Sequence, residues 1–499
     1  MDRNLTLTQP ELAADSLGFF RWGRIAGQVL VTTDAGEWAF LSDAEFADLL
    51  AGRVIDSHPR FAELQRKGLL RDGLDLDAFA TRVAQRNRHV RRNAYLHVAT
   101  LTTRRPGGAN GQAADAGRDM SRETAERVAE LALQSMSPAV TIELQADGGE
   151  PLLNFDALSH LVETALTRNK RSTGKALTIT LLSNCAAMTE ERAEWLIAKG
   201  VHLVTTLDGP AALHDANRSW KPGAPHAEVV RWIEYFTRRY AELGRDPDEW
   251  FVGALLTVTR QTLSAWAAVA DEYVARGLRA IHVQPLLASR VDADTWRSVG
   301  YGLDEYLAFY RQALADVLAR NRAGADLTER SAAIIATKIL TGDDAGVVDI
   351  QSPYGGGTAQ LAYDVDGRLF PDDDARRVDA LGDPLFALGQ VGEATLADLV
   401  RHPTVRAIAA ASLLDAQPMC ADCWNKPYCG FSPVQNYVSQ GDLFGQRAHC
   451  VQCKDHMAVS TALFEHLADG DAETRAILER WTAVGPRPPG DGRASKTPP

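Results

Sequence analysis

The stretch Ala139-Val-Thr-Ile-Glu-Leu-Gln-Ala-Asp-Gly-Gly-Glu-Pro151 joins a short run of apolar and β-branched residues to a turn. The run predicts a buried strand over Ala139–Gln145, and Gly148-Gly149 after it predicts a tight turn. Glycines at the end of a strand let a ligand approach backbone N–H and C=O groups, and Glu150 beside them can bind a cation. We therefore expect a ligand-binding turn at the carboxyl end of this strand.

Apolar runs of the same kind alternate with amphipathic helical patterns along the middle of the chain. Such alternation implies parallel strands joined by right-handed crossovers. Six units predict an open or partial barrel rather than a complete eight-fold one, with its active site at the carboxyl ends of the strands. The other five predicted strands are Tyr95–Leu101, Leu177–Ser183, Val201–Leu207, Phe251–Val258 and Ala280–Leu286.

Polar residues follow two further strands at the point where each ends. Ser183-Asn184 closes the third strand, and Leu207-Asp208-Gly209-Pro210 closes the fourth, with His214 and Arg218 nearby. Because parallel strands end at the same edge, these residues and the Gly-Gly turn predict one ligand site on the rim of the barrel.

A cysteine cluster lies near the C-terminus, while the remaining cysteine, Cys185, reads as a small buried hydrophobe. Two Cys-x-x-Cys pairs bring thiols to where one metal ion or cluster can draw them together. A disulfide framework suits small secreted chains better than a chain of this length. The residues alone permit a tetrahedral zinc site from four of the cysteines, with Cys429 spare, or an iron–sulfur cluster. The cluster consists of Cys420, Cys423, Cys429, Cys450 and Cys453.

The first 80 residues or so predict a small α+β unit. Strands at Gln28–Thr33 and Glu37–Leu41 precede a helix, Asp43–Leu50, which Ser42 caps. A hairpin followed by helices resembles a winged-helix peptide-recognition module; a packing extension of the next domain is the alternative. We expect residues 1–80 to have a core separate from that of the C-terminal region.

Residues 81–93 predict a linker whose many arginines face solvent. The Pro- and Gly-rich residues 484–499 predict a disordered tail.

The length, charge and composition of the chain limit the classes of protein to which it can belong. A chain of 499 residues exceeds one usual core, so two or three domains are expected. The net charge of −12 argues against a nucleic-acid partner. No apolar run approaches the roughly 18 residues that span a bilayer, and the N-terminus lacks a signal-peptide core, which together predict a cytoplasmic protein without a membrane partner.

From about Tyr95 to Leu467 the chain resembles the radical SAM enzymes with a C-terminal SPASM extension. Four features carry the resemblance: the segment Gly148–Leu153, the pair Ser183-Asn184, the run Leu207–Pro210, and the cysteine spacing that begins at Cys420. Among these enzymes, the B-type maturases of the His-Xaa-Ser peptide system look most similar. The resemblance implies a partial (βα)6 barrel over residues 94–325 and a SPASM-like extension over residues 326–470.

The resemblance also implies ligands. In the family, the Gly-Gly-Glu-Pro segment receives the amino and carboxylate groups of S-adenosylmethionine, and residues at the positions of Ser183 and Asn184 lie near its ribose. The cofactor-binding residues would thus be Gly148, Gly149, Glu150, Pro151, Ser183 and Asn184. An auxiliary [4Fe–4S] cluster would be held by Cys420, Cys423, Cys429 and either Cys450 or Cys453, with zinc as the alternative.

The chain departs from the family at the radical cluster. The family holds that cluster with C-x3-C-x2-C after the first strand, where this chain has Ala99–Gly108 without a cysteine. An iron–sulfur cluster needs several thiolates, which Thr and Arg cannot replace. A second family cysteine is replaced around Pro371–Asp374, where Asp373 either matches the family's general base or belongs to an acidic turn in water. At the position of a third family cysteine, this chain has Ser432 or Pro433.

The sequence therefore predicts a cluster-deficient component of a RiPP-type peptide maturation system, which binds a precursor peptide or a cluster-complete maturase partner. Two alternatives stay open: an enzyme that uses S-adenosylmethionine by non-radical chemistry, and a structural zinc or iron–sulfur scaffold.

Overall fold

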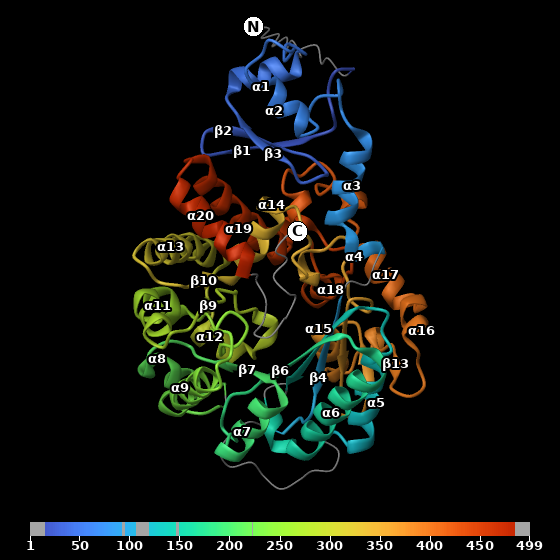
Figure 1. Cartoon of the computed structure of the whole chain (residues 1–499), viewed down its shortest axis with the longest axis vertical. Coiled ribbons are helices and arrows are strands. Elements are labelled where there is room, and N and C mark those ends of the chain that lie inside the picture. The colour runs from blue at the N-terminus through green and yellow to red at the C-terminus, as the bar shows by residue number, and fades with distance from the viewer. Residues whose placement is uncertain (1–14, 92–94, 106–118, 146–148, 222, 485–499) are drawn as a thin grey trace.

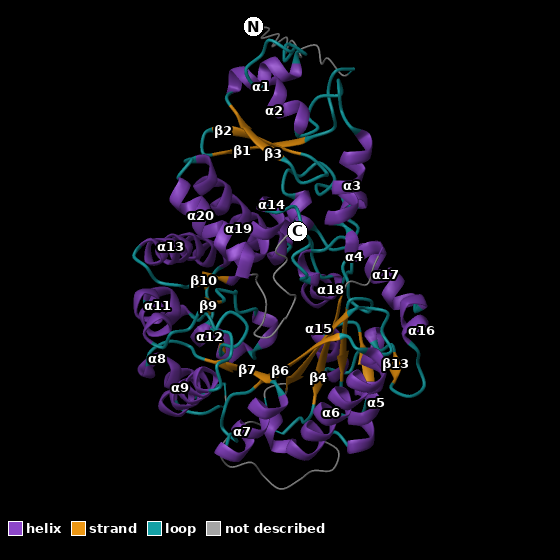
Figure 2. Ribbon diagram, in the orientation of Figure 1, coloured by secondary structure: helices purple, strands orange, loops and turns teal. Residues whose placement is uncertain are grey.

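The computed structural model describes residues 15–91, 95–105, 119–145, 149–221 and 223–484. Its centre is an eight-stranded sheet in the order β13-β12-β11-β4-β5-β6-β7-β8 (Figure 2). From β4 to β8 each neighbouring pair is parallel, as the sequence predicts. These strands are β4 (Tyr95–Leu101), β5 (Ala139–Gln145), β6 (Ala176–Leu182), β7 (Val201–Thr206) and β8 (Gly253–Leu255).

Parallel strands form here because helices cover them and bury their side chains. Val98, Ile142 and Leu181 have no exposed surface. Ser121 and Thr189 cap the starts of α5 and α7, and α7 ends at Gly200 in the left-handed conformation, φ 72°. The crossover helices are α5 (Arg122–Leu133), α6 (Phe155–Arg168), α7 (Glu190–Lys199), α8 (Ala211–Asn217), α9 (His226–Glu242), α10 (Arg260–Ser264) and α11 (Trp266–Ala275).

The predicted length of the sixth strand is wrong. Instead of Ala280–Leu286, the strand β9 covers Ala280–Ile281 and pairs with β10 (Thr328–Glu329) in a separate two-stranded sheet. His282 and residues 284–287 line a cavity beyond the strand end. An apolar run suits a cavity wall as well as a buried strand, and Pro285 has no N–H for a ladder.

The main sheet grows on its other side through a late segment. The strand β11 (Gln360–Tyr363) pairs in parallel with β4, and β12 (Arg368–Phe370) follows antiparallel. The short β13 (Gly389–Gln390) completes that edge. The hairpin of β11 and β12 therefore extends the central sheet.

An N-terminal module has its own three-stranded antiparallel sheet, β1 (Arg21–Ile25), β2 (Gln28–Thr32) and β3 (Trp38–Leu41). The predicted capping box is present, with Ser42 and Glu45 at the start of α1 (Asp43–Leu50). The first strand escaped the sequence analysis because its charges and central glycine are atypical of strands. The helices α1 and α2 (Phe61–Arg66) cover one face of this sheet (Figure 1).

The expectation of separate cores is wrong for the other face of that sheet, which lies on the cysteine-rich segment. A Cβ at Gly23 would lie 2.4 Å from the Trp424 ring, so only glycine permits this approach. The Thr32 hydroxyl donates to the Trp424 carbonyl over 2.8 Å, and the Tyr428 hydroxyl donates to the Gly36 carbonyl over 3.0 Å. The two ends of the chain therefore share an interface (Figure 1).

The predicted linker begins within α3 (Leu76–Arg86) and continues through α4 (Arg88–Arg91). Its last predicted residues lie outside the described part. The prediction of solvated arginines is wrong for Arg86, which is 5% exposed. Arg86 donates to the carbonyls of Lys338 and Pro427 over 2.7 and 2.8 Å. Long-range carbonyl partners explain this burial, and local sequence gives no sign of them.

Helices from the second half of the chain pack beneath the N-terminal module and beside the barrel (Figure 1). The predicted tail lies outside the described residues except for Val484, which ends α20. These helices are α12 (Ala293–Val299), α13 (Leu303–Arg322), α14 (Arg330–Leu340), α15 (Asp373–Ala380), α16 (Leu396–Arg401), α17 (Pro403–Ala411), α18 (Pro433–Gln440), α19 (Val451–Ala468) and α20 (Ala472–Val484).

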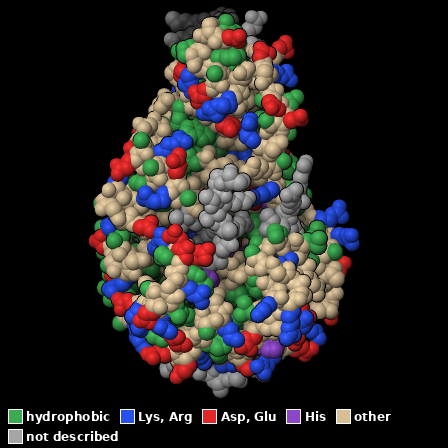
Figure 3. All heavy atoms as spheres, in the orientation of Figure 1, with side chains coloured by type: hydrophobic (Ala, Val, Ile, Leu, Met, Phe, Trp, Pro, Cys, Tyr) green, Lys and Arg blue, Asp and Glu red, His purple; other side chains and the backbone are tan. Residues whose placement is uncertain are grey.

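Acidic and basic side chains are interspersed over the face in Figure 3. Among the helices of the described residues, none combines the length and the apolar composition that crossing a bilayer requires.

Candidate functional site

The rim site forms around the carboxylate of Glu150, which is fully buried. Ser183 Oγ donates to it over 2.9 Å, and the backbone N–H groups of Leu152 and Asn184 donate over 3.0 and 2.8 Å. Burial raises the pKa of Glu150 to about 7, although these donors oppose the shift. The carboxylate thus ties the end of β5 to the end of β6.

The other predicted rim residues gather at the same place. The Asn184 amide donates to the Gly149 carbonyl over 3.3 Å, and Pro151 begins a short helical turn. Gly148 lies outside the described residues. Sequence analysis therefore located one cluster correctly, while its role in binding S-adenosylmethionine stays a prediction.

Asp208, at the end of β7, is buried in a network of opposite charge. It pairs with Arg218, and its Oδ1 accepts from the Thr257 N–H over 2.9 Å. Burial acts to raise the pKa of Asp208, but Lys221 and Arg218 hold it below the usual value. The backbone N–H of Asp208 donates to His214 Nδ1 over 3.2 Å. The predicted neighbours His214 and Arg218 are thus both in the site.

Two arginine ion pairs lie after β4. Arg104 binds Asp364 at the end of β11 through both carboxylate oxygens, and Arg105 binds both oxygens of Asp119. The first cysteine of the sequence is Cys185. The side chains at the end of β4 are therefore engaged with carboxylates and include no soft ligand for iron.

The C-terminal cysteines lie near one another and come from two segments. Burial raises the pKa of the Cys420 thiol to about 11, with the thiols of Cys453, Cys423 and Cys450 near enough to contribute. Burial also raises the pKa of Cys429, again with Cys453 and Cys423 nearby. All five are free cysteines. The five thiols thus converge on one region.

Basic and imidazole groups border this region. Arg447 Nη1 approaches Cys450 Sγ at 3.6 Å, and His456 Nδ1 lies 4.0 Å from Cys429 Sγ. In the part of the chain that the structure describes, no group of three or more His, Cys, Asp or Glu side chains is arranged to hold a metal ion. The donor set itself, five converging soft thiols, suits iron–sulfur or zinc chemistry.

Cys185 is a buried residue, as predicted. It is 1% exposed, its Sγ lies 3.3 Å from Thr205 Oγ1, and burial raises its pKa to about 12. A thiol with such a pKa stays protonated and is a poor nucleophile.

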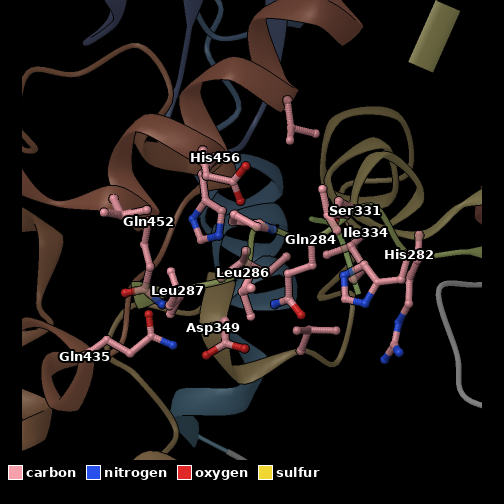
Figure 4. A pocket seen from close by; sticks show the side chains of 18 of the residues that line it. His282, Gln284, Leu286, Leu287, Ser331, Ile334, Asp349, Gln435, Gln452 and His456 are labelled. Carbon is pink, nitrogen blue, oxygen red and sulfur yellow. The ribbon is translucent and has the colours of Figure 1, made fainter. Parts of the chain in front are cut away.

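A chamber of about 300 Å³ lies beyond the ends of β8 and β9 (Figure 4). His282 and Gln284 line one side, Gln435 and Gln452 the other, and Asp349 lies between them. Burial lowers the pKa of His282 to about 3, so that imidazole is neutral near pH 7. Sequence analysis missed this chamber because its residues come from distant segments and belong to no motif.

The reading of Asp373 as part of a turn in water is wrong. Asp373 begins α15, its side chain is 26% exposed, and Arg376 Nη2 donates to it over 2.8 Å. Gln145 at the end of β5 also donates to it over 2.7 Å. Asp373 is therefore tied to the end of β5 in the central sheet.

No family model matches the sequence, and no curated protein does. Among solved structures, anSMEcpe with bound AdoMet matches with a TM-score of 0.58 and 15% identity, over 77% of this chain and 98% of that chain. The structure of anSMEcpe with bound AdoMet and Cp18Cys peptide gives a TM-score of 0.58 and 15% identity, over 75% and 98%. Streptococcus suis SuiB gives 0.49 and 13%, over 87% and 98%. The similarity to anSMEcpe shows an α/β fold with a mostly parallel central sheet, like that of radical SAM enzymes.

Replacing Glu150 by alanine should lower the stability of the protein by roughly 1–3 kcal/mol, since Ser183 Oγ and two N–H groups lose their acceptor. The shift of the urea unfolding midpoint measures this effect. Glu163→Ala, at an exposed position, is the control and should leave the midpoint nearly unchanged.

The same carboxyl predicts a pH dependence. Its folded pKa of about 7 exceeds the ordinary 4.5, so the folded chain holds the proton more tightly. The contribution of Glu150 to stability should thus fall as the pH rises from about 4.5 to about 7. Glu150→Gln should remove that part of the pH dependence; an unchanged profile would contradict the assignment.

Proposed function

We propose that this chain is a peptide-binding component of a peptide maturation system, built on the radical SAM fold but unable to generate the 5′-deoxyadenosyl radical. The observation that carries the proposal is the end of β4. There the chain has Arg104 and Arg105 in ion pairs with Asp364 and Asp119, and cysteine is absent from the sequence around them.

The radical cluster of the family does not fit these residues. Such a cluster needs three or more thiolates, and a guanidinium paired with a carboxylate supplies none. The proposed function therefore includes no step through that cluster.

The number and chemistry of the C-terminal thiols support an auxiliary cluster as part of the proposal. Cys420, Cys423, Cys429 and either Cys450 or Cys453 would hold it, as thiolates. Such a cluster, when bound, supplies structural cross-links and a site for one-electron transfer. The chain itself contributes Arg447, whose positive charge opposes the rise that burial causes in the pKa of Cys420.

S-adenosylmethionine binding at the rim is part of the proposal. The matched anSMEcpe structures carry bound AdoMet, and one also carries Cp18Cys peptide. Ser183 Oγ and the Asn184 N–H already donate hydrogen bonds to the Glu150 carboxylate. We therefore assign contact with the amino acid moiety of S-adenosylmethionine chiefly to backbone groups of the turn at Gly149.

Peptide capture is assigned to the N-terminal module. The strand β2 lies in the middle of its sheet, so only β1 and β3 are edges. Lys67 and Arg60 donate to the Trp38 and Phe40 carbonyls of β3 over 2.6 and 3.1 Å. The edge of β1 is thus the better place for an added strand, beside the half-exposed Trp22.

Anaerobic reconstitution should load about four iron and four sulfide per chain. Cys420→Ala, Cys423→Ala and Cys429→Ala should each abolish loading, whereas Cys185→Ala, remote from the cluster, should retain it. Metal and sulfide analysis measures the result. Stoichiometric zinc without sulfide, insensitive to Cys429→Ala, would show that the site is a zinc site.

Selection from a random peptide-display library should enrich sequences that bind the protein. Trp22→Ala should reduce their binding severalfold, because an apolar residue of the added strand loses its contact. Leu243→Ala is the matched control, since Leu243 is 49% exposed and Trp22 52% exposed. Equal loss in both variants, or none in either, would argue against capture at β1.

A further inference from the structure

A hollow of about 450 Å³, which we call the basic pocket, lies where the N-terminal module meets helices from the second half of the chain. On one side its walls are the turn before β3, the end of α2 and part of α3. On the other side they are the end of α14 and part of α20 (Figure 1). The charged residues of the lining are Glu37, Arg66, Lys67, Arg82 and Arg475. Basic side chains therefore outnumber acidic ones in this lining.

Two of these cations have carboxylate partners outside the lining. Lys67 Nζ lies 2.7 Å from Glu63, which Arg60 also binds. Arg475 Nε lies 2.8 Å from Glu479, and both of these side chains are about half exposed. These two pairs add no net charge to the pocket, and an exposed pair of this kind rearranges at little cost.

The other two arginines of the lining lack such a partner. Arg66, exposed at the end of α2, forms no hydrogen bond or ion pair with any residue in the described ranges. Arg82 Nε lies 4.0 Å from Glu37, which is too far for a hydrogen bond. The one carboxylate of the lining thus faces Arg82 loosely and leaves Arg66 without a counter-charge.

A further cation lies behind the pocket wall. Gly36, in the lining, has a left-handed φ of 74°, and a Cβ there would collide with the Arg86 guanidinium. Arg86 is buried and donates to two carbonyls, and it forms no ion pair within the part of the chain that the structure describes. Its positive charge is therefore close to the pocket.

Nearby carboxylates do not cancel the charge of Arg86. Three lie close enough to favour its charged form, and each has another cation beside it. The pairs are Glu37 with Arg82, Asp343 with Arg88, and Asp344 with Lys338. The charges of Arg66 and Arg86 therefore remain in excess around the pocket, which favours an anionic ligand.

Arg82 supplies a second, independent indication of a ligand. Its Nε is buried and has no hydrogen-bond acceptor. A buried donor without an acceptor is costly, and an oxygen atom of a ligand would remove that cost. The free edge of a guanidinium also matches the two oxygens of a carboxylate.

The size and the remaining lining of the pocket favour an organic anion over a lone inorganic one. A volume of about 450 Å³ is in the range of pockets that hold small organic molecules. Part of the wall is apolar and comes from Trp38, Ile339 and Leu340. The Trp38 indole N–H donates to the Ile339 carbonyl over 3.2 Å, which fixes this wall. Glutamate and aspartate present a carboxylate on a short aliphatic stem, and both parts find a matching surface here.

We propose that the basic pocket binds acidic side chains of a peptide, with their carboxylates against Arg66 and Arg82. This inference rests on the proposed peptide-binding function and specifies the residues that the peptide presents. The pocket includes the first residue of β3 and none of β1, so it is a site separate from the edge of β1.

The test uses two peptides that carry an uncharged BODIPY dye and an amidated C-terminus. One is glycine–serine–glutamate–glycine–glutamate–glycine–serine, and in the other glutamine replaces each glutamate. Fluorescence anisotropy measures the affinity of each for the full-length protein at fixed ionic strength. The glutamate peptide should bind roughly tenfold more tightly, as expected for hydrogen bonds between charged groups. Because the chain has a net charge of −12, such a preference reports a local site and not a general attraction of anions.

Two variants and a control locate the preference. Arg66→Gln and Arg82→Gln should each reduce it severalfold, because each removes one guanidinium from the pocket. Arg66 is exposed, so its replacement should leave the fold intact. Arg171→Gln is the matched control, since Arg171 is also exposed, has no ion pair among the described residues and lies outside the pocket. It changes the net charge equally and should leave the preference unchanged.

Inorganic phosphate, added as a competitor, tests the other source of an oxyanion. The inference predicts that phosphate binds more weakly than the glutamate peptide. Tighter binding of phosphate would show that the pocket takes a small inorganic anion, and it would overturn the assignment to a peptide.

Equal affinity for the two peptides, no binding of either, or a preference that survives both pocket variants would also overturn the inference. So would an equal loss in Arg171→Gln. The Trp22→Ala experiment reports separately on the edge of β1. Failure of the basic pocket alone therefore leaves the proposed function standing, whereas failure of both removes it.

Discussion

The pairing of β4 with strands on both of its sides is the constraint on which the rest of the structure depends. The strand pairs in parallel with β5 on one side and with β11 on the other. This pairing joins the strands β5 to β8 and the late strands β11 to β13 into one sheet. It also brings Arg104 and Asp364, which are 260 residues apart in sequence, into an ion pair at the end of β4. The feature that most distinguishes the site from that of a radical enzyme is thus held by the sheet.

The cysteine-rich segment contacts the N-terminal part of the chain, and it is also the candidate cluster site. Lys426 binds Asp34 over 3.1 Å, Arg86 binds the Pro427 carbonyl, and Trp424 packs on Gly23. All three contacts come from the loop between Cys420 and Cys429. Occupation of the thiols and the position of the N-terminal module therefore involve the same loop.

Sequence reasoning succeeded where local pattern decides the structure. The strands β4 to β7 are rich in apolar and β-branched residues, and the capping box at Ser42 is a local motif. It failed where distant partners decide. Arg86 and Asp373 are charged residues that look solvated locally, yet carbonyls and side chains far along the chain hold them inside. The chamber at Asp349 could not be found at all, since its lining spans residues 256–459.

The central claim is that the fold persists without radical chemistry. The most direct measurement is the yield of 5′-deoxyadenosine when the iron-loaded protein is incubated with S-adenosylmethionine and a strong reductant. The account predicts no product above a protein-free control, with or without peptide. Turnover that depends on the protein would contradict the account, because a radical cluster would then have to form without the cysteines that normally hold it.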